Sequence, residues 1–337
     1  ATLKFVLYTA FGSILMLAAL IYLVLYTHGS SGYMTFDLRH LSGSQLPLNT
    51  QLWLLSAFAL SFAIKVPMFP LHTWLPDAHV EAPTTGSVIL AGFPLFADAT
   101  RLFTPALLLL SGVSNIYGAC LALVQTDIKK IIAYSSISHL GYVMLGLASL
   151  DLIGIQGAIL QMVSHGLVAG GLFLMVGMIY ERTHSRAVAD YGGLAKMLPV
   201  FSVFFTILTL ASIGLPTTSG FAGEFMALLG AFNAAWPAHL AGNDLPLILA
   251  VIAVSGVVLG ALYMLWLAQR ILFGEARAPH APLSDLNARE TAILVAIVAA
   301  IFAIGLFPGE PLAKTELAAR EFQQLVAGET IQLGSTR

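Results

Sequence analysis

The sequence predicts an all-α protein that crosses a membrane several times, and three observations lead to this fold class. Charged residues make up 9% of the 337 residues and hydrophobic residues 58%, whereas roughly 25% of an ordinary soluble domain is charged. Apolar stretches close to the roughly 20 residues that a membrane-spanning helix needs recur along the chain. The net charge of −2, without a basic cluster, argues against nucleic-acid binding. We therefore expect a lipid bilayer around the chain and no nucleic-acid partner.

Eight stretches are long and apolar enough to be spanning helices. A ninth, Gly220 to Trp236, is shorter and rich in glycine, and Gly86 to Phe96 is too short to cross alone. In chain order, the eight expected spans are Phe5 to Tyr26, Leu52 to Phe69, Leu102 to Val124, Ile131 to Leu150, Leu152 to Tyr180, Leu198 to Leu215, Leu245 to Phe273 and Thr291 to Phe307.

Polar segments separate these spans. The longest connection is His28 to Gln51, and the chain becomes charged with a helical pattern from Gly309 onward, so both should lie in water or among headgroups. The first residues open almost directly into a span, without the features of a signal peptide, so the start resembles an internal break. Basic residues do not alternate cleanly between connections, and the sequence leaves the orientation in the membrane open.

Four titratable residues lie alone inside apolar stretches. Lys65 is the only charged residue between Arg39 and Asp77, and Glu224 is the only one between Lys196 and Asp244. His139 and His165 occupy two further spans. The candidate proton-pathway residues are therefore Lys65, His139, His165 and Glu224.

A charge at the centre of a bilayer costs at least about 2.5–3.5 kcal/mol, so such residues usually mark a proton or ion pathway. Burial in general moves lysine and glutamate toward their neutral forms, which suits proton loading and release, and histidine titrates near neutral pH. The alternative is that each residue is a buried polar group that holds helices together. That alternative is as good as the functional one for a single histidine and weaker for lysine and glutamate.

Residues that break helices lie next to both charges. Pro67 and Pro70 follow Lys65, while Pro216 and Gly220 precede Glu224. Broken helices at membrane depth expose backbone groups that must face protein or water, and inverted-repeat transporters place them at their ion sites. A simple proline kink without function remains the alternative.

The sequence has no phosphate-binding glycine loop and no Cys-x-x-Cys or paired-histidine spacing for a metal. His72 and His79 lie around Trp74 and Asp77 in a proline-rich segment that we expect to be a connection at the membrane surface. We therefore expect no metal ion and no cofactor in this chain.

Several motifs resemble the antiporter-like membrane subunits of proton-pumping NADH:quinone oxidoreductase, respiratory complex I. They are Lys65-Val-Pro-Met-Phe-Pro-Leu-His72-Thr-Trp-Leu-Pro-Asp77-Ala-His79-Val-Glu81-Ala-Pro83-Thr, Asp127-Ile-Lys129-Lys130-Ile-Ile-Ala-Tyr134-Ser-Ser-Ile-Ser-His139-Leu-Gly, His165-Gly with Tyr180-Glu181-Arg182, and Gly220-Phe-Ala-Gly-Glu224-Phe.

The resemblance implies fourteen helices, two inverted five-helix repeats with one broken helix each, and a central line of protonatable residues. It places Lys65 in the first half-channel, His139 and His165 on the connecting axis, and Glu224 at the end of the second half-channel. Glutamate at this last position, where sister subunits tend to carry lysine, favours the subunit M branch, called chain 4 in mitochondria. Four residues of the motifs are auxiliary candidates: Lys129, Lys130, His72 and Asp77.

Two departures from the family pattern are expected to matter. The chain starts at what resembles the sixth helix of the family, before which the glutamate partner of Lys65 would lie. The bridging lysine that the family carries after Gly86 to Gly92 has no counterpart in this sequence.

The expected division of the chain is residues 1–97 as the remainder of the first repeat, 98–274 as the second repeat, and 275–337 as a final span with a polar tail.

The resemblance implies a proton-translocating subunit in a bacterial inner membrane. Neighbouring antiporter-like subunits are the expected partners, and NADH, FMN, Fe–S clusters and quinone would bind to other subunits. Redox chemistry is not expected in this chain, although it would be part of a translocase enzyme. The alternatives are a subunit of a sodium/proton antiporter, a hydrogenase-linked ion pump, and a scaffold that does not conduct.

Overall fold

The computed structural model describes residues 2–37, 40–41, 46–66, 68–71, 95–275 and 283–327. Within these ranges the chain is helical, and its one β-type pairing is an isolated bridge between Asp127 and Ala187. The prediction of an all-α membrane fold is confirmed. Six helices in the described ranges are long and apolar enough to cross a membrane, in the stretches Leu7–Gly29, Ala97–Leu123, Ile128–Ala148, Leu152–Thr183, Leu245–Leu272 and Ala288–Leu306.

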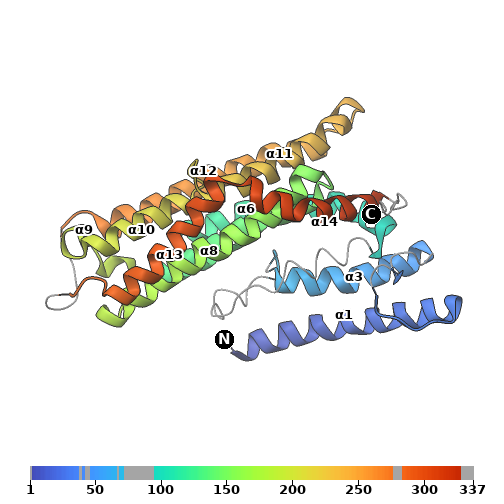
Figure 1. The fold of residues 1–337 in the computed structure, drawn as a ribbon, viewed down its shortest axis with the longest axis horizontal. Coiled ribbons are helices and arrows are strands. Elements are labelled where there is room, and N and C mark those ends of the chain that lie inside the picture. Colours follow the sequence, from blue (N-terminus) through green and yellow to red (C-terminus); the bar gives the residue numbers. More distant parts are fainter. Residues whose placement is uncertain are drawn as a thin grey trace.

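The first two helices form a pair beside the rest of the molecule (Figure 1). These are α1 (Thr2–Ser31) and α3 (Leu48–Lys65), which pack against each other, and α3 also contacts α6. Their contact is apolar, with buried side chains such as Leu23 and Phe58. The helix α3 ends at Lys65, four residues before the predicted end of that span.

The helices α6 (Ala97–Leu123), α7 (Ile128–Ala148) and α8 (Leu152–Thr183) are joined to one another by short connections. Two aspartates define the starts of α7 and α8. The carboxylate of Asp127 accepts hydrogen bonds from the first turn of α7, and Asp151 does the same for α8. Such caps satisfy amide groups that the helix leaves unpaired. In α7, 89% of the apolar membrane-spanning stretch is buried against the rest of the protein. The helix α7 is therefore the central helix of the bundle.

The short elements η1 (Val188–Asp190) and α9 (Leu194–Met197) lead to two helices that together cross the bundle. These are α10 (Pro199–Ser212) and α11 (Ser219–Leu240), which follow one another in nearly the same direction (Figure 1). Residues 213–218 between them are not helical. Gly214 and Thr217 have positive φ angles of 73° and 87°, which an α-helix does not allow. The predicted broken helix before Glu224 is confirmed.

The last helices are α12 (Leu245–Leu272), α13 (Ala288–Leu306) and α14 (Gly309–Ala327). The tail is helical, as predicted, and α14 packs against α8 and α6 rather than standing free. The Gln323 amide donates to the Leu150 carbonyl at 3.1 Å, and Arg101 donates to the Ala327 carbonyl at 2.9 Å.

Glycine allows α8 and α11 to approach very closely. A Cβ atom on Gly230 would lie 2.2 Å from both the Cα and the N atom of Gly154, closer than real Cβ contacts come. A Cβ atom on Gly157 would lie 2.5 Å from the backbone N of Ala227. Small residues permit this kind of approach between membrane helices. The two helices that carry the candidate site residues His165 and Glu224 are therefore in backbone contact.

Basic side chains gather at one end of the bundle. Hydrogen bonds between the segment after α8 and the start of α7, and between Gly193 and Phe273, join the segments at this end. The sequence places basic residues in separate connections, and the fold brings these connections together. The basic residues in the helix ends and connections there are Lys129, Lys130, Arg182, Arg186, Lys196, Arg270 and Arg289.

Candidate functional site

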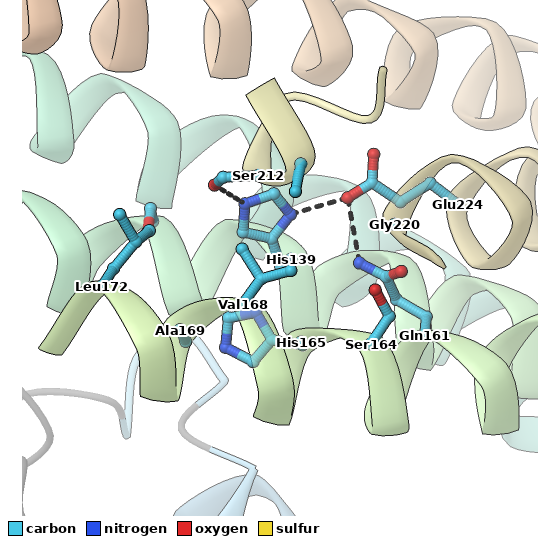
Figure 2. Close-up of a pocket in the computed structure, with 12 residues that line it drawn as sticks. His139, Gln161, Ser164, His165, Val168, Ala169, Leu172, Ser212, Gly220 and Glu224 are labelled. Carbon is cyan, nitrogen blue, oxygen red and sulfur yellow. Dashed lines mark hydrogen bonds and ion pairs between the residues drawn. The ribbon is translucent and has the colours of Figure 1, made fainter. Parts of the chain in front are cut away.

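The site centres on a contact between a histidine and a glutamate in the interior of the bundle. His139 Nδ1 lies 2.7 Å from Glu224 Oε1, and the two residues are 85 positions apart in the sequence. Each is 6% exposed. The distance is that of a strong, charge-assisted hydrogen bond. His139 projects from the middle of α7 and Glu224 from the second turn of α11 (Figure 2).

Two further side chains hold this pair. The Gln161 amide Nε2 donates to the same carboxylate oxygen of Glu224 at 2.9 Å. The Ser212 hydroxyl lies 3.4 Å from His139 Nε2, on the other side of the ring. Figure 2 shows the contacts running from Ser212 through His139 to the Glu224 carboxylate, where they turn toward Gln161.

His165 extends the cluster. Its ring centroid lies 5.3 Å from that of His139, with 38° between the ring planes. Both rings line a cavity of about 10 Å³, a volume on the scale that holds one water molecule. The hydroxyl groups of Ser164 and Ser219 share a hydrogen bond of 2.7 Å at the wall of the same cavity.

The break between α10 and α11 brings these groups together. Ser212 is the last residue of α10, and Ser219 is the first residue of α11. On α8, Gln161, Ser164 and His165 are three and four positions apart and therefore share one helix face. The cavity thus lies where the interrupted helix faces α7 and α8.

The charge balance of the site depends on His139. The described residues that line the cavity include no lysine or arginine, so its two histidines are the only basic groups among them. A proton on His139 would compensate the Glu224 carboxylate across their 2.7 Å contact. A carboxylate buried without such compensation is costly.

The structure places Lys65 outside this cluster. Lys65 is the last residue of α3 and is half-buried, and α3 contacts α1 and α6. Lys65 is not among the residues that line the cavity. Three of the four predicted pathway residues therefore meet in space.

The auxiliary candidates lie elsewhere. Lys129 and Lys130 are in the first turn of α7, at the basic end, where their backbone amides donate to Asp127. His72, Asp77 and the segment from Gly86 to Gly92 lie outside the described residues.

Sequence reasoning missed Gln161 and Ser212 as partners of the site. The signal was weak, because glutamine and serine are common in membrane helices and their role depends on what they face. The spacing of Gln161, Ser164 and His165 on one helix face was the available clue.

Within the described ranges, no group of three His, Cys, Asp or Glu side chains is arranged to hold a metal ion. The polar groups of the cavity instead suit proton exchange, because they alternate proton donors and acceptors at hydrogen-bond distance.

Comparison with known proteins adds to this geometry. The family described as NADH:quinone oxidoreductase/Mrp antiporter, TM, matches residues 1–243. The chain belongs to this family. The resemblance predicted from the motifs is confirmed.

Relatives within the family include two named subunits. The chain is 41% identical to NADH-quinone oxidoreductase subunit M of Rhodobacter capsulatus, over 99% of this chain and 67% of that protein. It is 44% identical to subunit M of Rickettsia prowazekii, over 93% of this chain and 64% of that protein. A solved chain of respiratory complex I from Thermus thermophilus with bound NADH matches with a TM-score of 0.82 and 35% identity, over 96% of this chain and 68% of that chain. The chain thus spans about two thirds of the length of these relatives.

Proposed function

We propose that this family member is a proton-translocating membrane subunit of NADH:quinone oxidoreductase, in which His139 and Glu224 exchange a proton. The observation that carries the proposal is the 2.7 Å contact between His139 Nδ1 and Glu224 Oε1, two residues that are each 6% exposed inside the bundle. The two relatives, which are M subunits of NADH-quinone oxidoreductase, support the link to NADH oxidation.

The proton moves along this hydrogen bond. When His139 is an imidazolium, its Nδ1–H bond breaks and an O–H bond forms on Glu224 Oε1, which leaves neutral histidine and a carboxylic acid. The His139 Nε2–H remains in place near Ser212. The pair thus passes one positive charge without separating ions in a medium of low dielectric constant.

Modest charge changes are sufficient to drive such a step. Moving a proton across a membrane potential requires about 2.3 kcal/mol per 100 mV. This free energy corresponds to a change of less than two pKa units at a proton carrier. We therefore propose that a charge change at Lys65 is relayed through His165 and His139 to Glu224, with Lys129, Lys130, His72 and Asp77 as auxiliary groups.

Assignment to this enzyme also implies how the chain is divided, which subunits surround it and how it lies in the membrane. Residues 1–97 and 98–274 would be parts of two repeats, and 275–337 the final span with its tail. Other membrane subunits would be the partners, with NADH, FMN, Fe–S clusters and quinone bound elsewhere in the complex. The basic end of the bundle would face the cytoplasm of a bacterial inner membrane, because positive residues are retained on that side.

Substitutions in the full-length protein test the proposal. We expect both Lys65→Ala and Glu224→Gln to lower the number of protons pumped per NADH, because each removes a charged carrier. The measurement is proton uptake and NADH oxidation by the purified complex in liposomes. Glu316→Gln on α14 is the matched control, since its carboxylate is exposed and pairs only with Arg320 among the described residues.

The outcome separates the alternatives. Unchanged pumping by both variants in an assembled complex would refute the pathway. Sodium-dependent transport without electron transfer from NADH would identify a cation/proton antiporter subunit. Poor assembly with normal transport per assembled complex would identify a scaffold.

A further inference from the structure

Gln161 has a side chain whose two polar ends are in different situations. Its Nε2 donates to Glu224 Oε1 at 2.9 Å, while its Oε1 is buried and has no hydrogen-bond partner in the described part of the chain. A buried polar atom without a partner is uncommon and usually has a functional or structural reason. The residue is 2% exposed, so bulk solvent does not satisfy this oxygen.

The oxygen that Gln161 contacts is the one that receives the proton. Glu224 Oε1 lies between His139 Nδ1, at 2.7 Å, and Gln161 Nε2, at 2.9 Å. While Glu224 is a carboxylate, an amide N–H is the right partner for this oxygen. Once Oε1 carries a proton, the new O–H group is a donor, and the facing N–H of Gln161 offers it no acceptor. The acceptor within reach is then His139 Nδ1, from which the proton came, at 2.7 Å.

An amide can meet both demands. Its NH₂ and C=O ends have nearly the same shape, and rotation of the terminal torsion exchanges a donor for an acceptor at one place. Gly223 lies against this amide, and a Cβ atom there would come within 2.7 Å of Gln161 Oε1, so the side chain fits here only beside a glycine. In the observed orientation the oxygen end has no hydrogen-bond partner among the described residues, so turning the amide breaks only the hydrogen bond to Glu224.

From these contacts we infer that Gln161 is a positioning residue whose amide turns over when Glu224 gains a proton. This inference rests on the proposed function. With Glu224 ionised, the amide N–H stabilises the carboxylate that accepts the His139 proton. With Glu224 protonated, the amide oxygen accepts the new O–H and directs that proton away from His139. Return of the proton to His139 is thereby disfavoured. The covalent changes are the broken Nδ1–H bond of His139 and the new O–H bond of Glu224, and the amide changes only its hydrogen bonds.

The test compares two substitutions with a control on the same helix. Gln161→Met keeps the length of the side chain and removes both hydrogen-bonding ends. Gln161→Glu keeps the shape of the side chain and places a second carboxyl group beside Glu224. Two adjacent carboxyl groups hold one shared proton at low pH and lose it as the pH rises. Gln156→Met is the control, because Gln156 lies on α8 and its amide donates to the Leu312 carbonyl of α14 at 3.4 Å.

The readout is protons pumped per NADH and the rate of coupled NADH oxidation, measured with the whole complex in liposomes across a range of pH. Since a hydrogen bond to a charged group contributes about 1.5–3 kcal/mol, we expect Gln161→Met to slow coupled turnover about tenfold or more at every pH. We expect Gln161→Glu to pump at acidic pH and to lose pumping as the pH rises. The control should retain the wild-type pH profile.

The inference is wrong if Gln161→Met and Gln161→Glu pump like the wild type per assembled complex while Glu224→Gln does not. That result would leave the proposed function intact. An unchanged Glu224→Gln variant would instead remove the proposed function. If Gln161→Met does not assemble, the pH profile of Gln161→Glu decides, and failure of both variants to assemble would assign Gln161 a structural role only.

Discussion

Replacing Gly230 with alanine is expected to force α8 and α11 apart and to lower the stability of the protein. The added Cβ atom would lie 2.2 Å from the backbone of Gly154 and 3.1 Å from Asp151 Oδ1, which caps α8. Overpacking in a well-packed core usually costs about 1–3 kcal/mol, and backbone atoms cannot yield as a flexible side chain does. We therefore expect a loss at or above the upper end of this range.

The measurement for Gly230→Ala is the amount of assembled complex in membranes and its midpoint of thermal unfolding. Gly177→Ala on α8 is the control, since no atom of the described chain lies within 4 Å of the position where its Cβ would be. A midpoint for Gly230→Ala equal to that of the control would show that the two helices have room to separate. Loss of pumping is also expected, because these helices carry Gln161 and Glu224.

Replacing Arg182 with methionine is expected to destabilise the basic end by about 3 kcal/mol, the scale for breaking a buried ion pair. Arg182 binds Glu290 through both terminal nitrogens, at 2.7 and 3.0 Å, and the two side chains are 15% and 13% exposed. Its Nε also donates to the Ser284 carbonyl at 2.8 Å. Without Arg182, the Glu290 carboxylate at the start of α13 would lose its positive partner.

The Arg182 prediction has a matched comparison in Arg320→Met. Arg320 pairs with Glu316 at 2.7 Å, but both side chains are about half exposed, and exposed pairs contribute roughly 0–1 kcal/mol. Unfolding midpoints of the two variants test the difference. The double variant with Glu290→Gln should be more stable than the sum of the single changes predicts, because no unpaired charge remains. A loss for Arg182→Met as small as that for Arg320→Met would contradict the prediction.

The Arg182 contacts also bear on the site. The segment that Arg182 binds includes Asp285, whose carboxylate accepts hydrogen bonds from the backbone of Val200 and Phe201 in the first turn of α10. The other end of α10 is Ser212, beside His139. Contacts at the basic end therefore hold the start of α10, the helix whose last residue, Ser212, lies beside His139.

Much of the fold follows from local features of the chain. Apolar stretches predicted the long helices, and the start of α8 at Leu152 agrees with the prediction. Pro216 and Gly220 predicted the interruption that separates α10 from α11. Helix ends were less accurate, since α3 stops at Lys65 and α10 at Ser212, three or four residues before the predicted ends. Apolar side chains continue past both ends, so composition did not reveal where the helical hydrogen bonds stop.

For the candidate site, the sequence predicted which titratable residues take part but not the contacts between them. Because isolated charges in apolar spans are costly, Lys65, His139, His165 and Glu224 stood out without a structure. The resemblance to the family implied a line of protonatable residues, but it did not predict which of them touch. Arg182 likewise looked like one of several basic residues in a connection, although it is nearly buried against Glu290.

Residue types therefore determined the membrane class, the helices, the broken segment and the set of titratable candidates, since these depend on composition and local spacing. Tertiary packing decided that His139 meets Glu224, that Gln161 shares the same carboxylate oxygen, and that Lys65 lies outside the cluster. The physical reason is the close approach of α8 and α11 at Gly154 and Gly230 and the position of the break beside α7. Such contacts depend on how helices pack against one another, and a hydrophobic pattern along one chain does not specify that packing.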